Sequence, residues 1–280
     1  MDIKQTKIFA AKIRLETVKM IGKRGFGHVA GSLSVADALA VLYNDVMQVR
    51  PENPTWDGRD KLVMSKGHAG PALYSALALK GFFPMDWLNT LNQPNTKLPS
   101  HCDAKLTPGV DATTGSLGQG ASVAVGIALA RQMDGLDART YLFLGDGECN
   151  EGQVWEAAMF ANQHKLANLT AFVDYNKRQL DGTVAEVMDL GDIAAKFASF
   201  GWYVQVVDGS CVEEIHKALT TTGGTDNTDG KPLCIILDTV KGAGVSVIEN
   251  VEMNHHMVVE GDLLNAAIAE CEAILAELGA

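Results

Sequence analysis

The sequence has few cysteines and no long apolar run, and both shortages restrict what the protein can be. The closest two of its five cysteines, Cys211 and Cys234, are 23 positions apart, and no Cys-x-x-Cys pair occurs. We therefore expect reduced, structural thiols in a cytosolic protein. No run of about 18 apolar residues is present, which argues against a membrane-spanning helix. Residues 2–7 are polar and no continuous apolar segment follows, unlike a secretory signal.

Basic segments are lacking as well. The formal net charge is −11, and no arginine-rich stretch or basic stripe offers a surface for a nucleic-acid backbone. The chain also has no internal repeat and no low-complexity linker. Its 280 residues, 47% of them hydrophobic, are enough for an α/β fold with a sizeable core. We expect one domain over residues 1–280.

The chain is organised around residues 140–182. Residues 140–144 form a short apolar run that predicts a buried strand, which ends in the turn Gly145-Asp146-Gly147. Apolar residues at helical spacing predict a helix over 153–166, and a second strand is expected over 169–173. Strand, turn, helix and strand in this order predict two parallel strands with a right-handed crossover, and so a mostly parallel sheet with helices on both faces.

This topology brings Asp146 and Asn176 to the same carboxyl edge of the sheet, where open α/β sheets bind ligands. A carboxylate and a carboxamide are a poor zinc site but a good partial shell for Mg²⁺, which prefers oxygen ligands and completes its shell with phosphate or water. Gly145 and Gly147 carry no Cβ, so a phosphate can approach the backbone closely. The sequence therefore predicts a metal-bridged diphosphate, without saying which one.

A Gly-Asp-Gly motif followed about thirty residues later by an asparagine resembles thiamine diphosphate enzymes, and GDGECNEGQVWEA resembles their transketolase branch. The similarity extends over residues 23–256. It implies the thiamine diphosphate-binding fold, in its diphosphate-binding domain, with thiamine diphosphate and Mg²⁺ as cofactors, Ca²⁺ or Mn²⁺ being alternatives to Mg²⁺. Within the resemblance, Asp146, Asn176 and the backbone carbonyl of Arg178 bind the metal.

Four histidines match functional positions of the family. His28 in a glycine loop and His101 in Leu-Pro-Ser-His resemble histidines that contact the sugar, and His68 in Ser-Lys-Gly-His resembles one that binds the diphosphate. His255 follows a Lys-Gly-x-Gly element and resembles a histidine that approaches both cofactor and substrate. The resemblance implies catalytic roles for His28, His101 and His255. It leaves open whether His255 or His256 is the functional residue, although spacing favours His255.

Further residues complete the implied cofactor site. The segment 111–120, DATTGSLGQG, is nearly the family's TTGxLGQG, in which Gly115 and Leu117 lie against the cofactor. Leu117 and Leu180 could equally be ordinary core leucines. Glu151 and Glu156 match glutamates of a network at the family's dimer interface, although carboxylates at a helix start are also common capping residues. The implied cofactor-binding set is His68, Gly115, Leu117, Gly147, Glu148, Asn176, Leu180 and His255.

Several local signals give further structural expectations. An amphipathic helix over 8–21 is expected to end at Gly22, and a helix over 35–45 to be capped by Ser34. Ser210 and Glu213 have the capping-box spacing before a helix over 210–219. Residues 220–231 are expected to form a polar surface loop, and residues 81–108 an irregular one. We interpret Lys66 as a solvated surface charge.

One group that thiamine chemistry requires has no match in this sequence. Thiamine chemistry needs a glutamate that tautomerises the aminopyrimidine, and in transketolases that residue and the arginines that hold the sugar phosphate lie in a second, pyrimidine-binding domain. The sequence ends at Ala280, directly after the diphosphate-binding domain. It therefore resembles the N-terminal subunit of a split transketolase, which implies an α2β2 heterotetramer with a separate pyrimidine-binding subunit.

The implied activity is a transketolase-type transfer of a two-carbon ketol unit from a ketose to an aldose. An alternative is the α subunit of a 2-oxoacid dehydrogenase decarboxylase, which shares the Gly-Asp-Gly motif and the asparagine. A third interpretation is a non-catalytic cofactor-binding module. The sequence does not name the sugar: pentose phosphates, a branched sugar and a sulfonated sugar all stay open.

Overall fold

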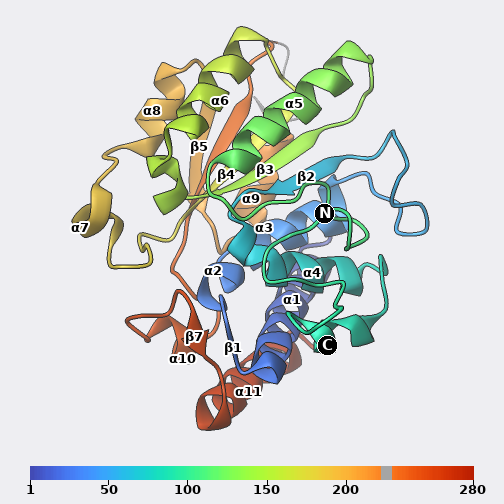
Figure 1. The fold of residues 1–280 in the computed structure, drawn as a ribbon, viewed down its shortest axis with the longest axis vertical. Coiled ribbons are helices and arrows are strands. Elements are labelled where there is room, and N and C mark those ends of the chain that lie inside the picture. Colours follow the sequence, from blue (N-terminus) through green and yellow to red (C-terminus); the bar gives the residue numbers. More distant parts are fainter. Residues whose placement is uncertain (222–228) are drawn as a thin grey trace.

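Helices cover both faces of a five-stranded parallel sheet in the computed structural model, which describes residues 1–221 and 229–280 (Figure 1). The strands follow the spatial order β2-β3-β4-β6-β5, and every neighbouring pair is parallel. This arrangement confirms the predicted fold class and the parallel pairing of β3 with β4. The strands are β2 (Lys61–Met64), β3 (Thr140–Gly145), β4 (Leu169–Tyr175), β5 (Tyr203–Asp208) and β6 (Leu233–Asp238).

The two helical layers differ in size. The core on one face of the sheet includes α5, α6 and α8, and the core on the other includes α1, α3, α4 and α9, with α11 packed against α1 on the side away from the strands. A short antiparallel pair, β1 (Phe26–Gly27) with β7 (Met257–Val258), lies outside the main sheet. The helices are α1 (Ile3–Arg24), α2 (Ala30–Leu33), α3 (Ala36–Val41), α4 (Gly70–Leu79), α5 (Gln119–Met133), α6 (Gly152–Gln163), α7 (Val184–Met188), α8 (Ile193–Ser199), α9 (Val212–Thr220), α10 (Ser246–Glu249) and α11 (Gly261–Glu277).

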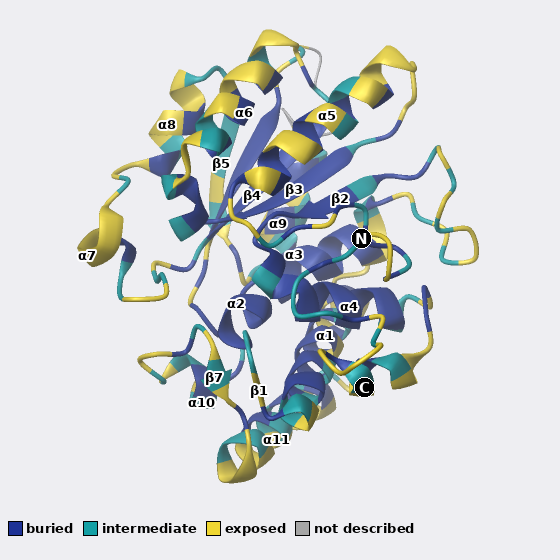
Figure 2. Cartoon of the chain, viewed as in Figure 1, coloured by how far each residue is buried: buried dark blue, intermediate teal, exposed yellow. Residues whose placement is uncertain are grey.

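The central strands are buried on both faces (Figure 2). In β3, Tyr141 and Phe143 belong to the core on the α1 side, whereas Leu142 and Leu144 belong to the core on the α5 side. Successive strand residues point to opposite faces, so a strand covered by helices on both sides needs an unbroken apolar run. This requirement explains why residues 140–144 carry no alternation of polar and apolar residues.

Helix α1 does not end at Gly22, as the sequence predicted, but continues to Arg24. The capping residue is Gly25, whose positive φ of 92° is easily reached by glycine and whose amide bonds the carbonyls of Ile21 and Gly22. Gly22 has a packing role instead, because a Cβ at this position would lie 2.3 Å from a methyl of Leu264 on α11. The glycine therefore allows the two helices to pack closely.

Two predicted helix caps are also wrong, because their side chains bind tertiary partners. The Ser34 hydroxyl donates to Asp174 at 2.7 Å, and α3 begins after Val35 without a side-chain cap. Glu213 forms an ion pair with Lys7 instead of a capping box with Ser210, and Cys211 precedes α9. Helix α3 is followed by a π-helical turn, Leu42–Val46. The expected loop over 220–231 lies mostly outside the described residues.

The described residues contain no helix that is both long and apolar enough to cross a membrane. All five cysteines are free, and four of them are buried. Burial raises the pKa of the Cys102 thiol to about 12 and that of Cys149 well above its usual range. Neither thiol is therefore suited to act as a nucleophile near neutral pH.

Two glycines in α5 allow a matched stability test. A Cβ on Gly120 would lie 2.5–2.7 Å from the side chain and Cα of Ser65, whereas a Cβ on Gly126 would meet no atom within 4 Å. We expect Gly120→Ala to lower the free energy of unfolding by about 1–3 kcal/mol through overpacking. Gly126→Ala should raise it by about 0.5–1 kcal/mol, because alanine favours a helix. Denaturant unfolding of both variants measures the difference, and equal effects would contradict this packing.

Candidate cofactor-binding site

A cavity of about 270 Å³, here called the edge cavity, opens at the carboxyl ends of the parallel strands. It collects every residue of the predicted site except Glu151 and Glu156, which lie outside it at the start of α6 and are exposed. Its lining consists of His28, Lys66, His68, His101, Gly115, Leu117, Gly145, Asp146, Gly147, Glu148, Asn176, Arg178, Gln179, Leu180, Lys241 and His255.

The predicted oxygen ligands come together at the ends of β3 and β4. Asp146 is 2% exposed; its Oδ1 accepts from the Gly147 amide at 2.8 Å and its Oδ2 from the Lys177 amide at 2.6 Å. Asn176 Oδ1 accepts from the Arg178 amide at 3.2 Å. Burial and the neighbouring charge of Asp174 raise the pKa of Asp146 to about 6. The Gly-Asp-Gly turn and the asparagine thus meet at one edge, as the topology predicted.

This donor set fits a cation that shares its shell with phosphate. Among the described residues, no three His, Cys, Asp or Glu side chains form a cluster that would hold a metal unaided. One carboxylate, one carboxamide and the Arg178 carbonyl offer only oxygen, which suits Mg²⁺ with diphosphate oxygens as the remaining ligands. The Arg178 carbonyl accepts from Lys241 Nζ at 3.2 Å, and both residues line the cavity.

Glu148 lines the edge cavity, but its carboxylate is already occupied by donors of this chain. It accepts from the Ser65 hydroxyl, from the Gly118 amide at 2.8 Å and from the Gly145 amide at 3.0 Å. The residue is 2% exposed. Glu148 therefore joins three loops around the cavity, a role that the sequence does not reveal.

Lys66 is not a solvated surface charge, contrary to our expectation. It is 1% exposed and forms an ion pair with the fully buried carboxylate of Asp174. Burial alone would raise the pKa of Asp174, but the charge of Lys66 and hydrogen bonds from Lys66, Thr239 and Ser34 outweigh burial and lower it. The prediction failed because a lysine after a strand is usually exposed, whereas this one lines the edge cavity and is paired with a buried aspartate.

Four histidines surround the cavity. The ring centroid of His28 lies 5.4 Å from that of His68, 5.6 Å from His101 and 5.2 Å from His255. Burial is the main cause that lowers the pKa of each of these four histidines. The pKa falls to about 4 for His28 and to about 3 for His255, and nearby His and Lys side chains contribute to both of these shifts. The lowered pKa of each ring favours its neutral form, which can both donate and accept a hydrogen bond.

His255 and His256 occupy different places. His255 lines the cavity, and its Nδ1 lies 3.0 Å from Lys241 Nζ. His256 is exposed, with its ring 4.6 Å from His28 and 5.5 Å from Phe26. An ammonium group can only donate, so Nδ1 of neutral His255 accepts and Nε2 carries the proton. The geometry thus favours His255, as the spacing did.

Leu117 and Leu180 are not core residues. They are 37% and 55% exposed and contribute apolar lining to the edge cavity. Gly115, on the segment before α5, has a φ of 155° and packs against His101, because a Cβ there would lie 3.4 Å from that ring. These residues give the polar cavity an apolar side that suits a flat organic ring.

Besides Lys66, the sequence analysis missed two side chains that shape the cavity, Gln179 and Lys241. Gln179 packs against Gly147, where a Cβ would lie 2.8 Å from its side chain, and donates to Asn150 at 2.8 Å. Lys241 donates to the Arg178 and Gln179 carbonyls at 3.2 and 3.3 Å. The Lys-Gly-x-Gly element was the available signal for Lys241, whereas nothing in the sequence marked Gln179.

Comparison with known proteins identifies similar chains of about the same length. The chain is 52% identical over 260 residues to the 6-deoxy-6-sulfo-D-fructose transketolase subunit SqwG of Clostridium sp. (strain MSTE9), covering 93% of this chain and 94% of that relative. It is 39% identical over 270 residues to one subunit of the apulose-4-phosphate transketolase of Phocaeicola vulgatus, covering 96% of this chain and 95% of that relative.

A solved transketolase from Campylobacter jejuni has the same fold, with a TM-score of 0.88 and 30% identity. The match covers 99% of this chain but 46% of that one, so this chain spans less than half of the solved enzyme. The family model described as the thiamine diphosphate binding domain of transketolase matches residues 5–271. The chain therefore belongs to the transketolase family, of which it forms the thiamine diphosphate-binding domain.

Proposed function

We propose that this chain is the cofactor-binding subunit of a two-subunit transketolase, which moves a two-carbon ketol unit from a ketose to an aldose. The observation that carries the proposal is the convergence of four histidines on the cavity that Asp146 and Asn176 also line. A module that only stored the cofactor would need the acid, the amide and His68, but not His28, His101 and His255. The family match supports transketolase rather than a 2-oxoacid dehydrogenase.

Each part of the edge cavity has a proposed role. Asp146, Asn176 and the Arg178 carbonyl would hold Mg²⁺ or a similar divalent cation, which would neutralise the charge of the diphosphate. His68 would bind diphosphate oxygens beside Gly147, whose amide already donates to Asp146, and the apolar side formed by Leu117 and Leu180 would cover the thiazolium ring.

When bound, thiamine diphosphate supplies a carbon nucleophile for the ketose carbonyl and an electron sink for cleavage of the adjacent carbon–carbon bond. His28, His101 and His255 hold the sugar hydroxyls near that carbonyl and move protons to and from its oxygens. Because Lys241 leaves His255 with its proton on Nε2, that nitrogen acts as a donor. Cavity walls that limit the access of water would protect the reacting carbon from unproductive protonation.

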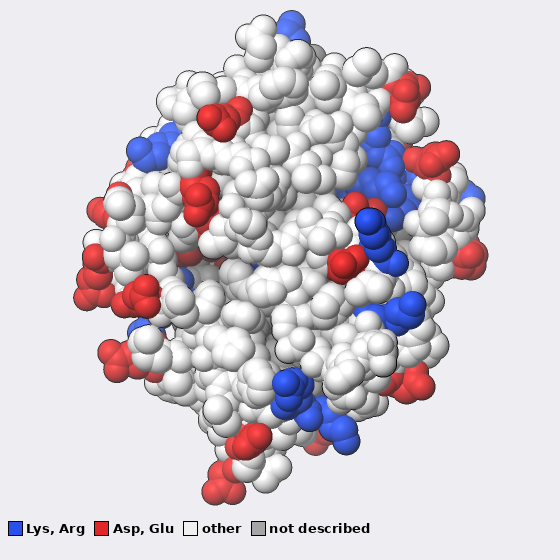
Figure 3. All heavy atoms as spheres, viewed as in Figure 1, with Lys and Arg blue, Asp and Glu red and all other residues white. Residues whose placement is uncertain are grey.

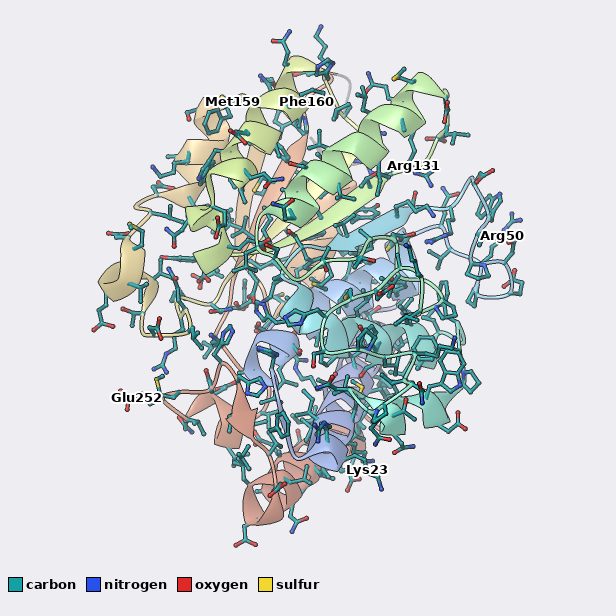
Figure 4. The ribbon with its side chains drawn as sticks, viewed as in Figure 1. Lys23, Arg50, Arg131, Met159, Phe160 and Glu252 are labelled. Carbon is teal, nitrogen blue, oxygen red and sulfur yellow. The ribbon has the colours of Figure 1, made fainter. Side chains whose placement is uncertain are left out.

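A partner subunit is part of the proposal. Two side-chain carboxylates line the described edge cavity, Asp146 and Glu148, and both are engaged, so the glutamate that activates the aminopyrimidine has to come from another chain or domain. The equally long relatives are named as transketolase subunits. Apolar side chains are exposed at the cavity, as at Leu180, and on the outer side of α6, where Met159 and Phe160 lie (Figure 4).

We further propose an α2β2 assembly in which each cofactor lies between unlike chains, with Glu151 and Glu156 near the contact. The face drawn in Figure 3 is largely uncharged at its centre, which suits burial against another protein. The named relatives act on a sulfonated ketose and on a sugar phosphate. We therefore propose a donor ketose with an anionic group at its far end, recognised mainly by the partner.

Removal of the Asp146 carboxylate should abolish metal-dependent cofactor binding. We expect Asp146→Ala to weaken thiamine diphosphate binding in the presence of Mg²⁺ by about 100-fold or more, since even outer-shell changes cost 10–100-fold. Calorimetric titration in the presence of the pyrimidine-binding subunit measures this loss. Asp137→Ala is the control, because Asp137 is exposed and precedes the opposite end of β3. Unchanged binding by Asp146→Ala would refute the metal assignment.

Ketol transfer should require both subunits. We expect the isolated chain with thiamine diphosphate and Mg²⁺ to show no turnover of a ketose donor, and activity to appear on addition of the purified pyrimidine-binding subunit. A coupled assay of aldose release measures this, and size-exclusion chromatography with light scattering gives the stoichiometry. Robust turnover by the isolated chain would contradict the two-subunit proposal.

The neutral state of His28 should make the fold sensitive to acid. The folded pKa of about 4 is below the unfolded value of about 6.5, so the unfolded chain binds more protons between these values. The stability contributed by His28 is therefore present above pH 6.5 and lost as pH falls toward 4. We expect His28→Asn to lose less unfolding free energy than wild type between pH 7.5 and 5.0. Denaturant unfolding at both pH values measures this, and an unchanged or larger loss in the variant would contradict it.

A further inference from the structure

The carboxylate of Asp174 has no role in the proposed chemistry, yet it is fully buried at the edge of the cavity and accepts four hydrogen bonds. Oδ1 accepts from the Thr239 hydroxyl at 2.6 Å. Oδ2 accepts from the Ser34 hydroxyl at 2.7 Å, from Asn176 Nδ2 at 2.9 Å and from Lys66 Nζ. The donors lie after α2, β2, β4 and β6, so one side chain joins four segments.

The bond from Asn176 determines which end of its carboxamide can face a cation. An ionised carboxylate only accepts hydrogen bonds, so the group that faces Asp174 has to be the amide nitrogen. The other end accepts from the Arg178 amide, and only the oxygen can do so. Two independent contacts therefore select the same orientation. A hard cation binds the oxygen and not the nitrogen, so this orientation is the one that allows Asn176 to act as a ligand.

Lys66 supplies the charge that allows the Asp174 carboxylate to be buried. A buried carboxylate without a partner is strongly unfavourable, and the ammonium group of Lys66 supplies the opposite charge directly on Oδ2. The pair is inaccessible to solvent, because Lys66 is 1% and Asp174 0% exposed. Lys66 thus keeps Asp174 an acceptor, and Asp174 keeps Asn176 in one orientation.

We propose that Asp174 is a positioning residue for the cation of the diphosphate site: supported by Lys66, it holds the nitrogen end of the Asn176 carboxamide and so presents the oxygen end to the metal. This inference rests on the proposed function and extends it to a residue that does not touch the cofactor. Outer-shell partners of this kind typically contribute 10–100-fold to metal affinity.

The test uses the full chain assembled with its pyrimidine-binding subunit, with Mn²⁺ as the probe and thiamine diphosphate present, and counts free Mn²⁺ by electron paramagnetic resonance. Asp174→Asn keeps the size of the side chain but can donate as well as accept, so it no longer selects the orientation of Asn176. We expect half-saturation at about 10–100-fold higher Mn²⁺, with the same number of ions bound at saturation.

Thr239→Val is the matched control. It removes a hydrogen bond to Oδ1 of the same carboxylate and leaves the contact with Asn176 intact. We expect its Mn²⁺ midpoint to stay within about twofold of wild type. If both variants instead shift the midpoint in proportion to their loss of thermal stability, the role of Asp174 is merely structural and the inference is overturned. An unchanged midpoint in Asp174→Asn also overturns it.

A second variant covers the case in which Asp174→Asn does not fold. Carboxylate is ordinarily a stronger ligand for Mn²⁺ than carboxamide, but in Asn176→Asp one oxygen would face Asp174 and be repelled. We therefore expect Asn176→Asp to bind Mn²⁺ more weakly than wild type, and tighter binding would overturn the inference. Failure of the wild-type assembly of both subunits to bind Mn²⁺ with the cofactor would instead refute the proposed function itself.

Discussion

The buried ion pair between Lys66 and Asp174 is the constraint on which the edge cavity depends. Two charges withdrawn from water are costly to keep, and their mutual attraction offsets that cost only when the geometry is good and the remaining lone pairs are satisfied. Here hydroxyl and amide donors from three further segments satisfy them. Because these donors come from loops distant in sequence, the full set of contacts is complete only when β2, β4 and β6 are aligned. The site is thus coupled to the packing of the sheet.

The parallel topology supplies that alignment. Each strand of the main sheet runs in the same direction, so the segments after β2, β3, β4 and β6 meet at one edge. The apolar runs of these strands are buried on both faces, which fixes their register and leaves the polar residues just beyond their ends to face one another. Histidines from separate loops then complete the cavity wall.

Much of this arrangement could be predicted from the sequence, since it depends on local signals. Continuous apolar runs predicted the strands, and the Gly-Asp-Gly turn and Asn176 were expected at one edge. The failures share one physical cause, competition from partners distant in sequence. Serine is a common helix cap, but Ser34 donates to Asp174. Glycine often ends a helix, but Gly22 packs against Leu264. Lysine is usually exposed, but Lys66 is buried in a pair with an aspartate 108 positions away. A single sequence does not reveal such pairings.

Exposed apolar side chains affect how this chain behaves before it assembles. They include Leu180 and the apolar residues on the outer side of α6. Apolar surface that awaits a partner promotes self-association while it stays uncovered. A chain synthesised in excess over its complement would therefore carry a liability that the assembled enzyme does not. Balanced production of the two polypeptides, for instance from one transcript, would limit that hazard and make the abundance of active enzyme follow the scarcer subunit.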